Sequence, residues 1–272
     1  MLNLLVSKAK GEIVVITDAN VIPDKETLKH LASRFFSPAI GLCDASVTSP
    51  GVSGEGVSRQ EKLYQSFETL LKRSEGRLSG AMSGPYGGFY AARKVLFPVL
   101  PENMLVDDLY AGLTVLQKGF RSINVKEAAV TEDHLPGIRD QYIRRVRIAA
   151  GSFQNLFHFG PFPGKGFMPS LCFFSHKVLR WFAPFLMILF FMTTVILSGH
   201  SDLYFCLLAA QLIFIFLSAI DMVLYGMGKT LRPLRYITQF IMMNAALVSG
   251  FFRALSGIKE GTWEPTKRVY DE

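Results

Sequence analysis

Short apolar runs alternate with amphipathic stretches over the first 150 residues of the chain. Residues 13–17 are all apolar or β-branched and stop at polar turn formers, which predicts a buried parallel strand. Further strands are predicted over residues 40–48 and 122–130, and helices over 24–36, 60–78 and from Asp107 to a turn at Gly119. This alternation indicates an α/β domain over residues 1–150.

Apolar spacing also predicts which helix faces are buried. Helix 24–36 presents Leu28, Leu31, Ala32 and Phe35, and helix 60–78 presents Leu63, Phe67, Leu70 and Leu71. The Gly/Ser-rich residues 49–58 predict a flexible surface loop, and the glycines of residues 83–88 precede a short strand and a helix.

Three long apolar segments follow the α/β domain. Residues 181–197 and 203–225 are long and apolar enough to cross a bilayer, whereas residues 237–255 carry Gln239, Asn244 and Arg253. We therefore expect two to three transmembrane helices over residues 181–257, after an interfacial segment at 151–180 and before a basic tail at 258–272.

Loop charges predict the orientation of these helices. Lys229, Arg232 and Arg235 lie in a loop without acids, while residues 198–202 contain no Lys or Arg. The positive-inside rule then puts residues 226–235 and the α/β domain in the cytoplasm, which fits a bacterial inner membrane or plasma membrane. Because three spans would leave the basic tail outside, either the third segment is re-entrant or interfacial, or the rule fails there.

Composition narrows the partners. The chain has 272 residues, is 50% hydrophobic and carries a net charge of +7, which suits phosphate ligands or an anionic membrane surface. Nucleic acid is disfavoured, because no basic stripe interleaved with aromatic residues occurs. The three cysteines match no disulfide or metal spacing, so we expect reduced and mostly buried thiols at Cys43, Cys172 and Cys206.

Several polar clusters could carry chemistry. Asp18 and Asn20 follow the first strand and could hold a hard divalent cation, or simply form a turn. Asp107 and Asp108 open a helix, either as caps or with one of them as a general base. The cationic stretch 139–151 suits a pyrophosphate or anionic lipid, whereas His134, His158 and His176 are scattered, and each is expected to be structural or interfacial.

The order of these motifs resembles that of the family 2 glycosyltransferases. The stretches that carry the resemblance are "KGEIVVITDANVIPD", "GPYGGFYAARK", "VDDLYAGLTVLQKGF" and "QYIRR", followed by membrane helices, and "GTWEPTKR" near the end of the chain is similar to a short motif of some members. The likeness is to the membrane-bound synthase branch that includes cellulose synthases and ceramide glucosyltransferase. It implies a GT-A domain followed by transmembrane helices. Such a domain transfers sugar with inversion from a nucleotide-sugar donor, expected to be a UDP-sugar, to a lipid or glycan acceptor.

The resemblance also implies roles for individual residues. Asp18 and Asn20 correspond to the family's D-x-D, which holds Mg²⁺ or Mn²⁺ and the donor diphosphate, although an amide here replaces the second acid. Asp108 corresponds to the base that deprotonates the acceptor hydroxyl. The donor-binding Q-x-x-R-W motif corresponds to Gln141, Arg144 and Arg145, with Arg in place of Trp, and the acceptor side to Gly87, Gly88, Phe89 and Asp107.

A second acidic motif competes for the role of base. Thr131, Glu132 and Asp133 spell the family's T-E-D literally, but Asp133 lies only eight residues before Gln141. Asp108 opens a helix that ends at a Gly-Phe turn, as the family's base does. The sequence therefore favours Asp108 and predicts that Glu132 and Asp133 belong to a loop approaching the arginine helix.

The strand of Asp18 lies unusually near Met1 for this family, whose nucleotide-binding strands precede the D-x-D strand. The chain therefore resembles the C-terminal part of a GT-A domain, an N-terminally truncated synthase. The alternatives are a catalytically inactive remnant, a partner subunit of such a synthase, or a basic peripheral lipid-binding protein.

Overall fold

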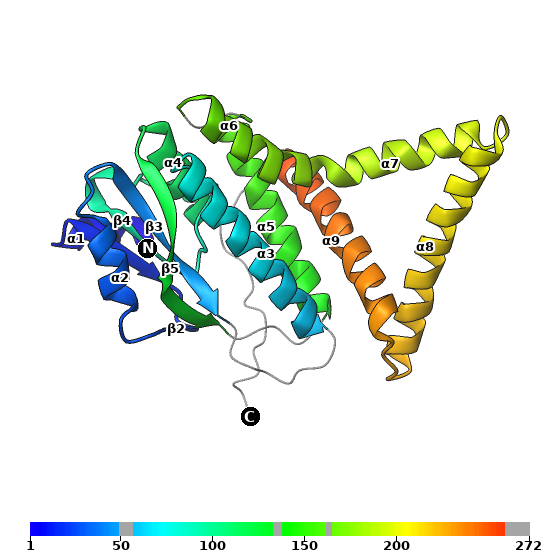
Figure 1. Cartoon of the computed structure of the whole chain (residues 1–272), viewed down its shortest axis with the longest axis horizontal. Coiled ribbons are helices and arrows are strands. Elements are labelled where there is room, and N and C mark those ends of the chain that lie inside the picture. Colours follow the sequence, from blue (N-terminus) through cyan, green and yellow to red (C-terminus); the bar gives the residue numbers. More distant parts are fainter. Residues whose placement is uncertain (49–56, 133–137, 162–164, 259–272) are drawn as a thin grey trace.

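A five-stranded sheet forms the centre of the α/β part (Figure 1). The computed structural model describes residues 1–48, 57–132, 138–161 and 165–258. The strands are β1 (Ile13–Thr17), β2 (Val21–Pro23), β3 (Ile40–Thr48), β4 (Phe89–Arg93) and β5 (Arg121–Glu132), in the order β1-β4-β3-β5-β2. Only β3 and β5 pair in parallel; the other pairs are antiparallel.

Alternation along the central strands separates two apolar layers. Cys43 and Ala45 of β3 pack with Leu31 of α2 (Thr27–Arg34). The intervening Leu42 points to the other face of the sheet and packs with Val115 of α4 (Asp107–Gln117). Since successive side chains of a strand point to opposite faces, α2 and α4 cover opposite sides of the sheet.

The first strand forms where the sequence predicts it, but the expected buried parallel environment is wrong. β1 pairs only with β4, in antiparallel register from Ile13 to Thr17, and lies at one end of the sheet. Its outer edge pairs with no other strand among the described residues. Val14 is therefore its one buried side chain, and Val15 is 40% exposed.

The predicted apolar helix faces are partly wrong. Leu31 and Phe35 are buried as expected, but Leu28 of α2 is exposed. In α3 (Val57–Leu78), Phe67 and Leu70 are exposed. The buried face of α3 is instead charged, because it carries Lys72 and Glu75. The predicted loop 49–58 lies mostly outside the described residues, and its last two residues begin α3.

Helices make up the rest of the described chain. A short α1 (Leu2–Lys8) precedes the sheet, and a single 3₁₀ turn, η1 (Lys94–Leu96), stands where the sequence predicts a helix after β4. After β5 come α5 (Ile138–Phe159), α6 (Phe167–Phe173), a π-helical turn η2 (Phe174–Val178), α7 (Leu179–Leu197), α8 (Asp202–Gly226) and α9 (Arg232–Leu255). The last three form the sides of an open triangle beside the α/β part (Figure 1).

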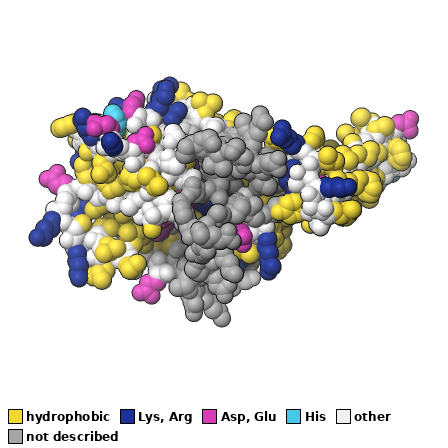
Figure 2. Space-filling view, turned by 90° about the horizontal axis from the view of Figure 1, so that it is seen from below, with side chains coloured by type: hydrophobic (Ala, Val, Ile, Leu, Met, Phe, Trp, Pro, Cys, Tyr) yellow, Lys and Arg dark blue, Asp and Glu magenta, His cyan; other side chains and the backbone are white. Residues whose placement is uncertain are grey.

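Two of the described helices are long and apolar enough to cross a membrane. They cover Phe167–Leu197 and Asp202–Gly226, in agreement with the first two predicted spans. Hydrophobic side chains gather at the end of the molecule that α7 and α8 form (Figure 2). Cys206 on α8 is exposed, so the expectation of mostly buried thiols holds only for Cys43 and, in part, Cys172.

The third apolar segment, α9, differs from these two helices. It buries polar side chains, Arg235, Thr238 and Gln239, and exposes Phe240 and Phe252. A side chain at Gly250 would come within 2.7 Å of the backbone nitrogen of Ala150, so α9 packs backbone to backbone against α5. This inverted amphipathic helix is typical of an interfacial segment, one of the alternatives that the sequence leaves open.

Candidate active site

The end of β1 and the end of β5 lie at the same side of the sheet, and polar residues gather there. Asp18 directly follows β1, and its backbone N–H donates to the carbonyl oxygen of Gly88 at 2.9 Å. The backbone N–H of Val21 donates to the carbonyl oxygen of Asp18 at 3.2 Å, which closes a turn. The Asp18 side chain is exposed, so its carboxylate remains accessible to a ligand.

Asp107 and Asp108 begin α4, as the sequence predicts. The Leu109, Leu113 and Leu116 stripe of this helix is buried, and Gly119 ends it with a φ of +87°. The N-cap of α4 is Val106, so neither acid caps the helix; Asp107 lies in the first turn, where its Oδ1 accepts a hydrogen bond from the backbone N–H of Asp108 at 2.9 Å.

Asp108 is poised between two protonation states. Burial, and secondly the neighbouring Asp107 carboxylate, raise the pKa of Asp108 from 3.8 to about 7. Gly87 lies against this carboxylate: a Cβ added there would be 2.7 Å from Asp108 Oδ2. A carboxyl group with a pKa near 7 can exchange a proton near neutral pH, which suits a general base.

Glu132 connects three parts of the site, and the sequence did not predict this. Its Oε1 accepts hydrogen bonds from Asn20 Nδ2 and from Arg144 Nη2, both at 3.3 Å, and its Oε2 accepts one from the Tyr86 hydroxyl. The predicted loop is wrong at this residue, because Glu132 is the last residue of β5 and pairs with Val21 of β2. Asp133, the other acid of the motif, lies outside the described residues.

The helix α5 places the predicted donor-side residues along the site. Gln141 is buried, and its Oε1 accepts a hydrogen bond from Gln239 Nε2 of α9 at 3.4 Å. Arg144 reaches Glu132, and Arg145 is partly buried beside it. Arg147 belongs to the cationic stretch that the sequence predicts for a pyrophosphate or anionic lipid. Burial and the neighbouring Arg144 lower the pKa of Arg147, and Asp18, Asp108 and Asp107 oppose that shift.

Asp44, another residue that the sequence did not predict, holds the glycine loop. Its Oδ1 accepts a hydrogen bond from the backbone N–H of Tyr86 at 2.6 Å. Its Oδ2 accepts from Asn124 Nδ2 at 3.1 Å and lies 3.3 Å from Lys72 Nζ. Burial raises the pKa of Asp44, and the Lys72 ammonium opposes that shift. The charged inner face of α3 therefore supports the loop that contacts Asp108.

The same face of α3 joins the sheet to the helix that leads into α7. His176 lies between two acids, with Nδ1 2.6 Å from Glu75 Oε1 and Nε2 3.1 Å from Glu68 Oε2. Glu75 also accepts a hydrogen bond from the backbone N–H of Ser83 at 2.9 Å. Lys177 and Arg180 pair with Glu68. His176 is thus structural, as the sequence predicts.

The donor set at Asp18 fits a metal ion only if a ligand completes it. No group of three or more His, Cys, Asp or Glu side chains that could hold a metal occurs within the described part of the chain. Asp18 supplies a carboxylate, and the Asn20 amide points its nitrogen at Glu132, which leaves its oxygen available. One carboxylate and one amide oxygen suit Mg²⁺ or Mn²⁺ when phosphate oxygens and water supply the other ligands.

The arrangement combines a carboxyl group of raised pKa, a helix that carries arginines, and a carboxylate and an amide two residues apart. Of the predicted residues, it brings Asn20 and Arg144 to the same oxygen of Glu132, and Gly87 to Asp108. The carbonyl oxygen of Gly88 accepts the hydrogen bond from the backbone N–H of Asp18. Phe89 is buried in the core rather than lining a surface. The literal T-E-D motif is the one sequence signal that could have indicated Glu132.

Comparison with known proteins places the fold. No protein-family profile matches the chain, and no curated protein sequence does. The mannosyltransferase PcManGT from Pyrobaculum calidifontis, solved with GDP-Man and Mn²⁺, shares 20% sequence identity at a TM-score of 0.63. The likeness covers 93% of this chain, which spans only 65% of that one.

A weaker likeness is to glucosyl-3-phosphoglycerate synthase from Mycobacterium tuberculosis, solved with Mn²⁺, UDP and glucosyl-3-phosphoglycerate. It has 17% identity and a TM-score of 0.33, and it covers 54% of this chain and 51% of that one. The likeness to PcManGT is the one that carries weight, and it concerns the fold. Over the matched part, this chain shares the fold of that mannosyltransferase.

Proposed function

We propose that the chain belongs to an inverting glycosyltransferase that moves a sugar from a nucleotide-sugar donor to a lipid or polysaccharide acceptor. The observation that carries the proposal is Asp108. It is a carboxyl group with a pKa of about 7, and it lies against the glycine backbone of residue 87. The likeness to PcManGT, which was solved with GDP-Man and Mn²⁺, supports the same reaction class.

Asp108 acts as the base in this proposal. Its carboxylate takes the proton of an acceptor hydroxyl while the acceptor oxygen bonds to the anomeric carbon of the donor sugar. The bond between that carbon and the diphosphate breaks, and the nucleoside diphosphate leaves with the electron pair. General-base catalysis of this kind contributes about 10²- to 10⁴-fold in rate.

The other residues bind and orient. Asp18 and Asn20 would hold Mg²⁺ or Mn²⁺, which supplies positive charge for the donor diphosphate. Arg144, Arg145 and Gln141 would bind the diphosphate from α5, because guanidinium groups form paired hydrogen bonds to phosphate. Gly87, Gly88, Phe89 and Asp107 form the acceptor side, with Phe89 acting from the core by fixing the glycines.

The membrane belongs to the proposal too. The two helices that are long and apolar enough to cross a bilayer, and the exposed aromatic side chains of α9, support a catalytic domain held at the surface. Loop charges favour the cytoplasmic face, so the acceptor would be a membrane lipid or a glycan made at that surface.

We also infer that the chain is part of a longer synthase of family 2. β1 ends the sheet and pairs only with β4 among the described strands, and the chain spans 65% of PcManGT. Strands that pair with the outer edge of β1 would bring the nucleoside site beside Asp18. The open edge equally favours the alternative, an inactive remnant or partner subunit.

Asp108→Asn tests the reaction. Membranes containing the chain would be given UDP-glucose or GDP-mannose with Mn²⁺, and release of the nucleoside diphosphate would be measured. We expect the wild-type chain to release product and the variant to lose about 10³-fold of that rate, with donor affinity unchanged. Asp140→Asn, on the first turn of α5, is the matched control. Equal rates for wild type and Asp108→Asn would exclude Asp108 as the base.

Calorimetry distinguishes an active enzyme from the alternative, an inactive remnant. Binding of UDP or GDP in the presence of Mn²⁺ by the purified chain would reject the inactive remnant. If neither nucleotide binds and no turnover occurs, the chain alone is not the enzyme, and the proposal for this chain fails.

A further inference from the structure

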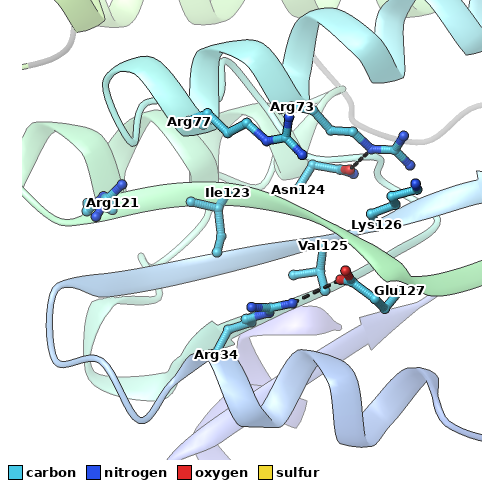
Figure 3. A pocket seen from close by; sticks show the side chains of 10 residues that line it. Arg34, Arg73, Arg77, Arg121, Ile123, Asn124, Val125, Lys126 and Glu127 are labelled. Atoms are coloured by element: carbon cyan, nitrogen blue, oxygen red, sulfur yellow. Dashed lines mark hydrogen bonds and ion pairs between the residues drawn. The ribbon is translucent and has the colours of Figure 1, made fainter.

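A second cationic site lies at the opposite end of β5. A pocket of about 470 Å³ opens between α2, α3 and the first half of that strand. Figure 3 shows Arg73 and Arg77 on the α3 side, Arg34 on the α2 side and the side chains of β5 between them. The lining residues are Arg34, Arg73, Gly76, Arg77, Arg121, Ile123, Asn124, Val125, Lys126 and Glu127.

The charges of this pocket are not balanced. Five of its lining side chains are cationic and one is acidic. Arg34 pairs with that acid, Glu127, at 2.9 Å. Arg73 is fixed by hydrogen bonds, from Nε to Asn124 Oδ1 and from Nη2 to Ser46 Oγ, each at 3.1 Å.

Three cations remain around the pocket. Arg77, Arg121 and Lys126 are exposed, and none of their side chains has a hydrogen-bond or ion-pair partner among the residues that the structure describes. Like charges on one small pocket repel each other, so their gathering raises the free energy of the empty protein. A bound anion would instead lower the free energy of the protein, because it attracts all three cations.

The backbone holds these groups in place. Arg73 and Arg77 are four residues apart on α3 and therefore share one face of that helix. Gly76 lies where α3 packs against β5, and a Cβ there would make an ordinary contact of 3.5 Å with the Cα of Ile123. Gly80 has a φ of +68°, and a side chain at this position would collide with the Arg121 guanidinium. Gly80 thus makes room for Arg121.

The lining also indicates the class of ligand. It contains no aromatic side chain, so a nucleobase would find no surface on which to stack. Arg121 and Arg77 offer guanidinium forks, which match the oxygens of phosphate. We propose that this pocket binds the phosphate groups of a small anion or a lipid headgroup, at a site separate from the donor site.

An alternative reading is that the charges only guard an open strand edge. Natural proteins place Lys and other charged side chains on such edges to prevent pairing with another chain. That reading accounts for Lys126 on β5. It does not account for Arg77, which comes from a helix and has no ladder to protect. The proposal does not depend on the proposed glycosyl transfer, because the cations that carry it, Arg77, Arg121 and Lys126, have no role in that reaction.

The test is calorimetry of the full chain in neutral detergent with inorganic pyrophosphate and EDTA, so that no metal assists the donor site. We expect the wild-type protein to bind, and Arg77→Gln together with Arg121→Gln to weaken binding by roughly tenfold or more. Lys8→Gln with Lys10→Gln removes the same charge from exposed positions near the chain start and is the control. It should change affinity by about twofold or less.

A second arm identifies the source of the phosphate. Soluble dihexanoyl-phosphatidylglycerol replaces pyrophosphate in the same titrations, and the tighter ligand indicates a lipid headgroup or a free phosphate compound. Loss of either binding in the pocket variant but not in the control supports the proposal. Absence of binding by both ligands, or equal weakening by both double variants, overturns it. Because Arg77 and Arg121 are exposed, both variants should keep the wild-type melting temperature.

Discussion

The two ends of β5 both gather arginines, but only one end supplies carboxylates to match them. At the carboxyl end, Glu132 holds Arg144 at 3.3 Å, and Asp18, Asp107 and Asp108 oppose the charge of Arg147. At the amino end, Glu127 is the one acid of the pocket. The proposed metal ion and proton transfer at the carboxyl end both require acids, whereas cations alone suffice for the anion proposed at the amino end.

The largest difference between the two ends of β5 is expected when one glycine at each end is replaced by alanine. Gly87→Ala should lower kcat by about 10²-fold, because the new methyl group displaces the Asp108 carboxylate from its present place. Stability should change little, since that carboxylate is the flexible end of a side chain. The comparison variant is Gly80→Ala, where φ is +68°. It should lower the melting temperature and leave kcat unchanged; a reversed pattern would contradict the assignment of the two ends.

The next largest effect is expected on the free energy of unfolding, when one acid is removed from each end of β5. Glu132→Gln should lower the free energy of unfolding by about 1–3 kcal/mol, because Arg144 is left without its buried charged partner. Urea denaturation measures this. Glu127→Gln, at the exposed pair with Arg34, should stay within about 0.5 kcal/mol of wild type. An equal loss of unfolding free energy in the two variants would mean that Glu132 and Glu127 stabilise their arginines to the same extent.

The pH dependence separates the ends further. With its pKa of about 7, Asp108 is protonated at pH 6 and largely ionised at pH 8, so turnover should rise across this range. Asp107→Asn removes the neighbouring charge that raises this pKa and should move the rise to lower pH, by about one unit or less. Pyrophosphate binding at the amino end should not follow this titration, as measured by calorimetry at the same pH values.

The smallest expected effect on the fold comes from adding an acid to the amino end. Lys126→Glu reverses one exposed charge of the pocket, and its effect on stability should stay within about 0.5 kcal/mol. Pyrophosphate binding should fall markedly while sugar transfer continues at the wild-type rate. Loss of transfer in this variant would show that the two ends are coupled.

The sequence predicts best where local signals are strong. The apolar run of β3 and the Leu109, Leu113 and Leu116 spacing of α4 lead directly to buried elements, and α4 brings Asp108 with it. The environment of β1 was less predictable, because burial of an apolar run depends on whether a second strand pairs with its other edge.

Long-range contacts explain the remaining misses. Glu132 belongs to a strand only because β2 pairs with it, through Val21 in a segment 111 positions away. The charged inner face of α3 has the same origin. Lys72 meets Asp44, and Glu75 meets His176, and neither partner lies on the helix itself. Helix periodicity cannot indicate such partners, so it assigned the exposed Phe67 to the core.

One consequence concerns the contact between α9 and its neighbours. Gly250 sets α9 against the backbone of α5 at Ala150, and a Cβ at Gly151 would lie 2.9 Å from the backbone nitrogen of Val106, which precedes Asp107. These two close contacts join α4, α5 and α9 into one packed unit. A displacement of α9 at a membrane surface would therefore be passed through α5 to Asp108, the proposed base. We expect the position of that carboxylate to depend on how α9 is seated at the surface.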